Sequence, residues 1–227
     1  MTIEAVLFDK DGTLFGFDET WGGWTLGVIE ALSGGDADCT AALADALMFD
    51  PVQLRFDPAS PVIAGTAESS AAVMLPHLSG WTLPALAQEI NNRAMNVEPV
   101  PPVPLAAVLD ALAPRILGVA TNDAEGPAWQ QLEAAGVAER FAFVAGYDSG
   151  FGAKPGPDML LAFIRAVGVS SDRIAMVGDS THDLRAGRAA GMVTVGVLTG
   201  PAPATVLKPF ADVVLPDISA LPAWLDR

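Results

Sequence analysis

Cysteine and basic side chains are scarce in this chain of 227 residues. Its single cysteine, Cys39, excludes an internal disulfide and favours a reducing compartment, so we expect a cytoplasmic protein. The 12 lysines and arginines are outnumbered by 27 aspartates and glutamates, which gives a formal net charge of −15. Because such a surface repels anionic polymers and anionic lipid, we expect neither a nucleic-acid partner nor a membrane partner.

Long apolar runs are missing as well. No uninterrupted apolar run reaches the roughly 18 residues that a membrane-spanning helix needs. The N-terminal residues lack a basic segment followed by an apolar stretch and a small-residue cleavage site, so we expect no signal peptide. Hydrophobic residues nevertheless make up 51% of the chain, which is enough for a large core. The length suggests one domain with a sizeable insertion, and we expect a monomer or a homodimer.

Short apolar runs alternate with helical patterns over much of the chain. Each run is short and bounded by turn residues, as is typical of a buried parallel strand. We expect strands over residues 3–8, 115–120, 141–145, 173–177, 193–197 and 212–215, and helices over residues 103–113, 124–136, 157–168 and 182–191. This alternation predicts βαβ units and therefore an α/β fold with a doubly wound, Rossmann-like parallel sheet.

Residues 17–97 interrupt this alternation. Helical patterns cover most of the segment, over residues 19–32, 38–49, 66–78 and 83–95. The chain returns to the alternating pattern through the proline-rich residues 98–104, which predict a stiff extended link. We therefore expect a core of residues 1–16 and 98–227, with an all-helical domain of residues 17–97 inserted after the first strand.

Polar side chains follow several of the expected strands. Carboxyl ends of parallel strands form the edge at which open α/β sheets bind their ligands, so these side chains should lie close together. The set consists of Asp9, Asp11, Thr121, Asn122, Lys154, Asp179 and Asp183. Crowded carboxylates repel one another unless a cation lies among them, and several hard oxygen ligands favour Mg²⁺.

These residue types suit phosphoryl transfer. An aspartate such as Asp9 can attack phosphorus and form an aspartyl-phosphate. A second carboxyl group, at Asp11, can protonate the leaving oxygen and then activate water. Lys154 and the hydroxyl of Thr121 can hold the phosphate beside the metal.

The residues after Asp11 suit close approach of a phosphate to the backbone. Gly12 and Thr13 would allow backbone N–H groups to approach its oxygens. Asn122, after the second core strand, is a further candidate for contact with the phosphate.

The ordered motifs resemble those of the haloacid dehalogenase superfamily, and in particular its phosphoglycolate phosphatase-like branch with a helical cap of the C1 type. The segment Asp9-Lys10-Asp11-Gly12-Thr13-Leu14 matches the first motif of that superfamily, Asp-x-Asp-Gly-Thr/Val-Leu. Thr121 matches the second motif, Lys154 the third, and Gly178-Asp179-x-x-x-Asp183 the fourth. The match spans residues 9–183, and the order of the motifs makes it specific.

The resemblance implies a Mg²⁺-dependent phosphatase that hydrolyses phosphoglycolate or a similar small phosphorylated metabolite through an aspartyl-phosphate. It implies that Asp9 is the nucleophile and Asp11 the general acid and base, with Thr121 and Lys154 completing the catalytic set. The implied metal site consists of Asp9, the Asp11 backbone carbonyl and Asp179, with Asp183 supporting the metal or orienting Lys154. Predicted substrate contacts are Gly12, Thr13, Asn122 and Arg55.

The same residues argue against two other chemistries of the superfamily. Its dehalogenases lack the second aspartate of the first motif, whereas this chain has Asp11. Its phosphonate-cleaving members use a cap lysine, and residues 17–97 contain no lysine. Two alternatives stay open: a phosphosugar mutase built on the same motifs and, opposed by the insertion, a phospho-acceptor module similar to response-regulator receivers.

Lys10, two tryptophans and a histidine carry further expectations. The Lys10 side chain should point away from Asp9 and Asp11, in a structural or supporting role. Trp21 and Trp24 could face a substrate, but core packing is the favoured interpretation, and His182 is expected at the surface.

The expected cap holds two arginines, Arg55 and Arg93, and surface exposure is the favoured interpretation for both. If either entered the site, a substrate with a second anionic group, such as a carboxylate, would fit it.

Overall fold

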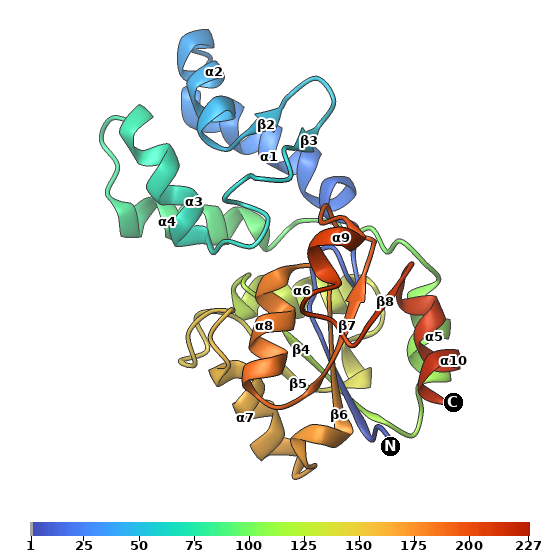
Figure 1. Cartoon of the computed structure of the whole chain (residues 1–227). Helices are drawn as coiled ribbons and strands as arrows, with labels where there is room; N and C mark the ends of the chain where they lie inside the picture. Colours follow the sequence, from blue (N-terminus) through green and yellow to red (C-terminus); the bar gives the residue numbers. More distant parts are fainter. Residues whose placement is uncertain (1) are drawn as a thin grey trace.

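A six-stranded parallel sheet forms the centre of the computed structural model, which describes residues 2–227 (Figure 1). The strand order is β5-β4-β1-β6-β7-β8, and every neighbouring pair is parallel. The strands are β1 (Ala5–Phe8), β4 (Ile116–Ala120), β5 (Phe141–Ala145), β6 (Ile174–Gly178), β7 (Val193–Val197) and β8 (Val213–Leu215). The predicted α/β class and the six predicted core strands are confirmed.

Side chains alternate between the two faces of the sheet because successive residues of a strand point in opposite directions. Val6 and Phe8 of β1 belong to one buried cluster, which includes residues of helices α5 (Leu105–Ala111), α6 (Glu125–Ala134) and α10 (Leu221–Leu225). Ala5 and Leu7 belong to a second cluster, with residues of α7 (Asp158–Val167) and α8 (Thr181–Ala189). Helices therefore cover both faces, as the doubly wound prediction requires.

Two short core helices have no counterpart in the sequence-based prediction. They are α9 (Ala204–Leu207) and α10. Each has five residues or fewer, which is too short to show a helical period in the sequence.

The insertion after β1 contains four α-helices, which lie above the carboxyl edge of the sheet in Figure 1. They are α1 (Phe17–Ser33), α2 (Ala37–Ala46), α3 (Ala67–Met74) and α4 (Leu83–Ala94). The segment is not all-helical, which corrects the prediction, because β2 (Phe49–Asp50) and β3 (Arg55–Phe56) form an antiparallel pair. Two-residue strands carry too little alternation to be recognised in a sequence.

The insertion, here called the cap, has a buried apolar cluster of its own. The members of that cluster lie between Phe17 and Val97, the range expected from the sequence. The division of the chain into two domains at these boundaries stays a prediction. Among residues 2–227, no helix combines the length and the apolar character that crossing a membrane requires.

Helix α4 offers a matched test of the cap core. Leu86 is fully buried, whereas Leu83 on the same helix is 38% exposed. We expect Leu86→Ala to lower the free energy of unfolding by about 2–5 kcal/mol, because the truncation leaves a cavity. Leu83→Ala should stay within about 0.5 kcal/mol of wild type. Urea denaturation followed by tryptophan fluorescence measures both, and equal losses would contradict this packing.

Candidate active site

The predicted site residues meet because three adjacent strands end together. Phe8 at the end of β1 lies beside Val119 of β4 and Val177 of β6. Asp9 continues the ladder, since its backbone N–H donates to the carbonyl of Val177 at 2.8 Å. Asp9 after β1, Thr121 after β4 and Asp179 after β6 are therefore neighbours at the carboxyl edge.

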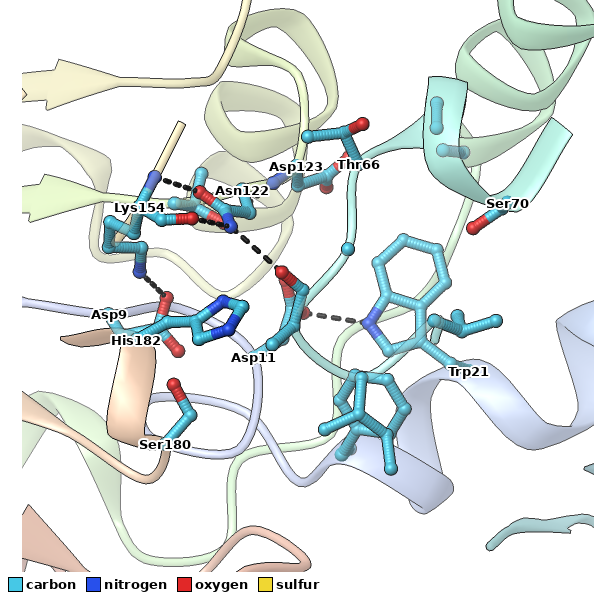
Figure 2. A pocket seen from close by; sticks show the side chains of 18 of the residues that line it. Asp9, Asp11, Trp21, Thr66, Ser70, Asn122, Asp123, Lys154, Ser180 and His182 are labelled. Carbon is cyan, nitrogen blue, oxygen red and sulfur yellow. Dashed lines mark hydrogen bonds and ion pairs between the residues drawn. The ribbon is translucent and has the colours of Figure 1, made fainter. Parts of the chain in front are cut away.

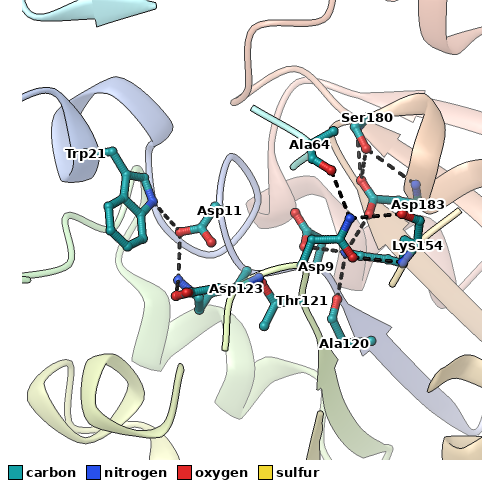
Figure 3. A network of polar contacts seen from close by, with 12 residues as sticks. Asp9, Asp11, Trp21, Ala64, Ala120, Thr121, Asp123, Lys154, Ser180 and Asp183 are labelled. Atoms are coloured by element: carbon teal, nitrogen blue, oxygen red, sulfur yellow. Dashed lines mark hydrogen bonds and ion pairs between the residues drawn. The ribbon is translucent and has the colours of Figure 1, made fainter. Parts of the chain in front are cut away.

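Lys154 is the cation at the centre of this edge. Its Nζ donates to Asp9 Oδ1 at 2.5 Å and to the Ala120 carbonyl at 2.7 Å, and it lies 2.7 Å from Asp183 Oδ1 (Figure 3). Burial alone would lower the pKa of this ammonium group, but Asp183 and Asp9 raise it above the usual value. Lys154 therefore stays charged although it is buried.

Asp183 is held in place by the first turn of α8. Its Oδ2 accepts from the Ser180 hydroxyl at 2.6 Å and from the Ser180 backbone N–H at 3.0 Å. Ser180 in turn caps the helix by accepting from the Asp183 N–H, which forms a capping box. Both carboxylate oxygens of Asp183 are thus engaged, one by Ser180 and one by Lys154.

Three carboxylates crowd around this lysine. Asp9, Asp179 and Asp183 each offer an oxygen within 4.8 Å of the others, and all three residues are buried. Burial raises the pKa of Asp9 to about 7, with Lys154 opposing the rise and Asp183 and Asp11 adding to it. Burial also raises the pKa of Asp179 well above its usual value, and the charges of Asp9 and Asp183 add to the rise.

This donor set fits a hard divalent cation. Oxygen ligands with excess negative charge are the ligands that Mg²⁺ prefers, and a cation among them would offset their repulsion. Asp9 and Asp179 are the better-placed ligands, because both oxygens of Asp183 already have partners.

Glycine is required where the first loop passes Asp179. Gly12 has a φ of +81°, which L-residues with a side chain rarely adopt, and a Cβ there would collide with the Asp179 carboxylate. Its carbonyl accepts from the Thr199 hydroxyl at 2.6 Å. Thr13 is fully buried, and its hydroxyl is not among the groups that line the site cavity.

Asp11 faces the same cavity and is clamped through one oxygen. Oδ1 accepts from Trp21 Nε1 at 2.7 Å and from Lys10 Nζ at 2.8 Å. Lys10 also donates to Gln131 Oε1 at 2.5 Å and lies 3.1 Å from Asp123 Oδ2. The expectation that Lys10 points away from Asp11 is therefore wrong, because a fully buried ammonium group needs these carboxylates as partners.

One ammonium group faces two carboxylates in this second cluster. Burial would lower the pKa of Lys10, but Asp11 and Asp123 raise it. Burial raises the pKa of Asp123, and Lys10 acts in the opposite direction. Lys10 is thus a cation shared between two carboxylates beneath the cavity.

Thr121 keeps one hydrogen for a ligand. Its Oγ1 accepts from the Asp123 backbone N–H at 3.0 Å, and its side chain lines the cavity. The hydroxyl hydrogen is then free to donate, and the position of Thr121 beside a phosphate stays a prediction.

Asn122 lies at the expected strand end but is engaged elsewhere. Its Oδ1 accepts from the Lys154 N–H at 2.8 Å, and its Nδ2 donates to the carbonyls of Lys154 and Ala64 at 2.9 Å each. The expected phosphate contact is therefore not favoured, because both amide hydrogens are used. Asn122 instead links the lysine loop to the cap, through the carbonyls of Lys154 and Ala64.

Arg55 lies apart from the site. Its Nε is 3.3 Å from Asp18 Oδ2, and its side chain is 66% exposed. It borders a separate groove, together with Phe49 and Phe56 of the β2–β3 pair. The predicted contact between Arg55 and the substrate therefore has no support from its position.

A cavity of about 90 Å³ lies between the core and the cap (Figure 2). The core contributes Asp9, Asp11, Thr121, Asn122, Asp123, Lys154, Asp179, Ser180, His182 and Asp183. The cap closes the other side with side chains of α1, α3 and α4 and with the loop of residues 62–66. The volume is small beside the several hundred Å³ of usual ligand pockets, so only a small molecule fits this arrangement.

Sequence reasoning missed three partners in the site. The sequence favours core packing for Trp21, and the structure shows that it both packs in the cap cluster and donates to Asp11. Asp123 and Gln131 were not singled out. One signal was available: a lysine two residues after a buried strand needs carboxylate partners, and Asp123 follows the end of the neighbouring strand. His182, expected at the surface, is half-buried and lines the cavity.

Comparison with known proteins agrees with this geometry. The family model described as haloacid dehalogenase-like hydrolase matches residues 61–197. A phosphoglycolate phosphatase of Rhodospirillum rubrum is 40% identical over 121 residues, which cover 52% of this chain and 50% of that protein. The match thus spans about half the length of this curated relative. The chain belongs to the haloacid dehalogenase-like hydrolase family.

Solved structures share the fold over nearly the whole chain. CbbY from Rhodobacter sphaeroides in complex with phosphate has a TM-score of 0.71 and 22% identity, covering 100% of both chains. A predicted phosphoglycolate phosphatase from Haemophilus somnus 129pt has a TM-score of 0.72 and 17% identity, covering 100% of this chain and 99% of that one. At such identities the likeness describes the fold alone.

The buried cluster around Lys10 makes a stability prediction. We expect Lys10→Met to lower the free energy of unfolding by about 3–5 kcal/mol, because it leaves the largely buried Asp11 and Asp123 without their cation. Adding Asp123→Asn should recover part of the loss by removing one of the stranded charges. Chemical denaturation of both variants provides the measurement.

Lys208→Met is the matched control, since Lys208 is exposed. It should change stability by less than about 0.5 kcal/mol. Equal effects at the two lysines, or no recovery in the double variant, would contradict the assignment of Lys10 as the shared cation.

The raised pKa of Asp9 predicts that the stability of the metal-free protein depends on pH. Unfolded Asp9 loses its proton near pH 3.8, whereas the folded group keeps it until about pH 7. Across that window the unfolded state binds fewer protons, so the contribution of Asp9 to stability falls as the pH rises. The rise from 3.8 to about 7 corresponds to about 4 kcal/mol.

Asp9→Asn removes this titration. With EDTA present, the two proteins should be similarly stable near pH 4, and the variant should gain on wild type by up to about 4 kcal/mol as the pH approaches and passes 7. Urea denaturation across this range measures the difference. A difference that does not change with pH would contradict the raised pKa.

Proposed function

We propose that this protein is a Mg²⁺-dependent phosphatase that hydrolyses a small phosphomonoester, a class that includes phosphoglycolate. One observation carries the proposal: Asp9, paired with Lys154 and crowded by Asp179, shares a small cavity with Asp11. The name of the Rhodospirillum rubrum relative supports the same class of reaction.

In the first half of the reaction, a carboxylate oxygen of Asp9 attacks phosphorus, and the bond from phosphorus to the ester oxygen breaks. The departing oxygen takes a proton from Asp11. Oδ1 of that group is held by Lys10 and Trp21, so Oδ2 is the oxygen that carries the proton. The products are an aspartyl-phosphate at Asp9 and a free alcohol.

In the second half, Asp11 takes a proton from water, and the water oxygen attacks phosphorus. The bond between phosphorus and Asp9 breaks, which releases inorganic phosphate and restores both aspartates. The cap covers one side of the cavity and reduces its contact with bulk water, and Asp11 orients the attacking molecule.

The negative charges of Asp9 and of the phosphoryl group would be stabilised by Lys154, Thr121 and the metal. Lys154 stabilises the carboxylate form of Asp9, and Thr121 can donate its hydroxyl hydrogen to a phosphate oxygen. Mg²⁺, held by Asp9 and Asp179 with the Asp11 carbonyl, would neutralise charge that develops on the phosphoryl group. Asp183 fixes the position of Lys154.

Replacement of the nucleophile tests this function. Asp9→Asn should lower kcat for phosphate release by at least about 10⁴-fold, because amide oxygen cannot replace the attacking carboxylate. Asp38→Asn, an exposed aspartate of the cap, is the matched control and should retain wild-type activity. Circular dichroism of each variant separates lost chemistry from lost folding.

The assay is run on a panel of small phosphomonoesters, with Mg²⁺ and again with EDTA. Metal-dependent release that disappears in Asp9→Asn is the expected result. Near-wild-type release by Asp9→Asn would overturn the covalent mechanism. Isomerised sugar phosphate without net phosphate release would favour the mutase alternative.

A further inference from the structure

Among residues 2–227, no lysine or arginine lines the cap side of the cavity. Its lining side chains are Phe17, Trp21, Trp24, Thr25, Val62, Ile63, Ala64, Thr66, Ala67, Ser70, Ile90, Asn91 and Ala94. Most are apolar, and the polar members carry hydroxyl, amide or indole groups. Within residues 2–227, the basic side chains that border this cavity are Lys154 and His182, and both come from the core.

Both arginines of the cap are occupied away from the cavity. Arg55 is exposed and paired with Asp18. Arg93 pairs with Glu89 one helical turn earlier on α4, at 2.7 Å, and its side chain is 38% exposed. Neither is among the residues that line the cavity.

Negative charge already dominates the core side of the cavity. Five carboxylates line it: Asp9, Asp11, Asp123, Asp179 and Asp183. The three N–H groups of Lys154 Nζ are directed at two of these carboxylates and at a backbone carbonyl. A phosphomonoester adds further negative charge. A second anionic group on the substrate would therefore enter a partly apolar space without a cationic partner, which is unfavourable.

Two cavity-lining residues of the cap have polar atoms with no hydrogen-bond partner. They are Trp24 Nε1, a donor, and Asn91 Oδ1, an acceptor, and both atoms are buried. Asn91 is oriented by its other end, since Nδ2 donates to the Tyr147 hydroxyl at 2.9 Å. A hydroxyl group on a ligand can accept a hydrogen bond from such a donor or donate one to such an acceptor.

We infer that the cap selects phosphomonoesters whose leaving group is small, uncharged and hydroxyl-bearing, and that it discriminates against a leaving group with a carboxylate. This inference rests on the proposed phosphatase function and narrows its substrate class. Trp24 and Asn91 are the specificity-determining residues of the cap, and the absence of a cation there excludes the second anion.

Two esters of matched size test the inference. Phosphoglycolate and 2-hydroxyethyl phosphate differ only in a carboxylate against a CH₂OH group. We expect kcat/KM to be at least about tenfold higher for 2-hydroxyethyl phosphate. Equal values, or a preference for phosphoglycolate, would overturn the inference and leave the phosphatase proposal intact.

A charge placed in the cap provides a second test. Ser70 lies on α3 and lines the cavity (Figure 2), so Ser70→Lys would supply the missing cation. The variant should shift the ratio of kcat/KM toward phosphoglycolate by at least about tenfold. Ser70→Met, of similar length without charge, should leave that ratio within about twofold of wild type. No shift in a folded Ser70→Lys variant would count against the charge argument.

A generic ester separates the two proposals. If p-nitrophenyl phosphate is hydrolysed with Mg²⁺ but 2-hydroxyethyl phosphate is not, the inference about the leaving group fails alone. If none of the three esters releases phosphate, the proposed function fails and takes the inference with it. If Ser70→Lys does not fold, the comparison of the two matched esters by the wild-type protein decides.

Discussion

The buried pairing of Lys154 with Asp9 and Asp183 is the contact on which the site depends. Burying several carboxylates at the tip of a central strand is unfavourable, as the raised pKa values of Asp9 and Asp179 show. One ammonium group offsets part of that repulsion and fixes two carboxylates at once. The remaining excess of negative charge leaves the site suited to a divalent cation and a phosphoryl group.

A second buried lysine, Lys10, follows Asp9 directly in the sequence and also pairs with two carboxylates. Lys10 lies between Asp11 and Asp123, and the indole of Trp21 completes the clamp on Asp11. Trp21 belongs to the cap, so the group that we propose as acid and base is positioned partly by the cap itself. Asn122 makes a second link, through the carbonyl of Ala64. These two contacts therefore couple the position of the cap to the arrangement of the side chains in the site.

The sequence pattern predicts the strands of the core correctly, because the burial of a strand is visible in its own residues. Buried parallel strands are short apolar runs, and their carboxyl ends share one edge, so Asp9, Thr121 and Asp179 had to meet there. Contacts between the cap and the core could not be predicted from the sequence, because they depend on how helices that are distant in the sequence pack together. The hydrogen bond from Trp21 to Asp11 is one such contact. The position of Arg55 is another, because Arg55 lies on the β2–β3 pair, away from the cavity, and each of these strands has only two residues.

Direct detection of the covalent intermediate tests the central claim most sharply. The protein is mixed with a phosphomonoester that it hydrolyses in the presence of Mg²⁺, quenched in acid and reduced with borohydride, which converts an aspartyl-phosphate to homoserine. Peptide mass spectrometry then reads position 9. The account predicts homoserine at that position and nowhere else. Steady phosphate release with unmodified Asp9 under the same quench, or homoserine at another aspartate, would contradict it.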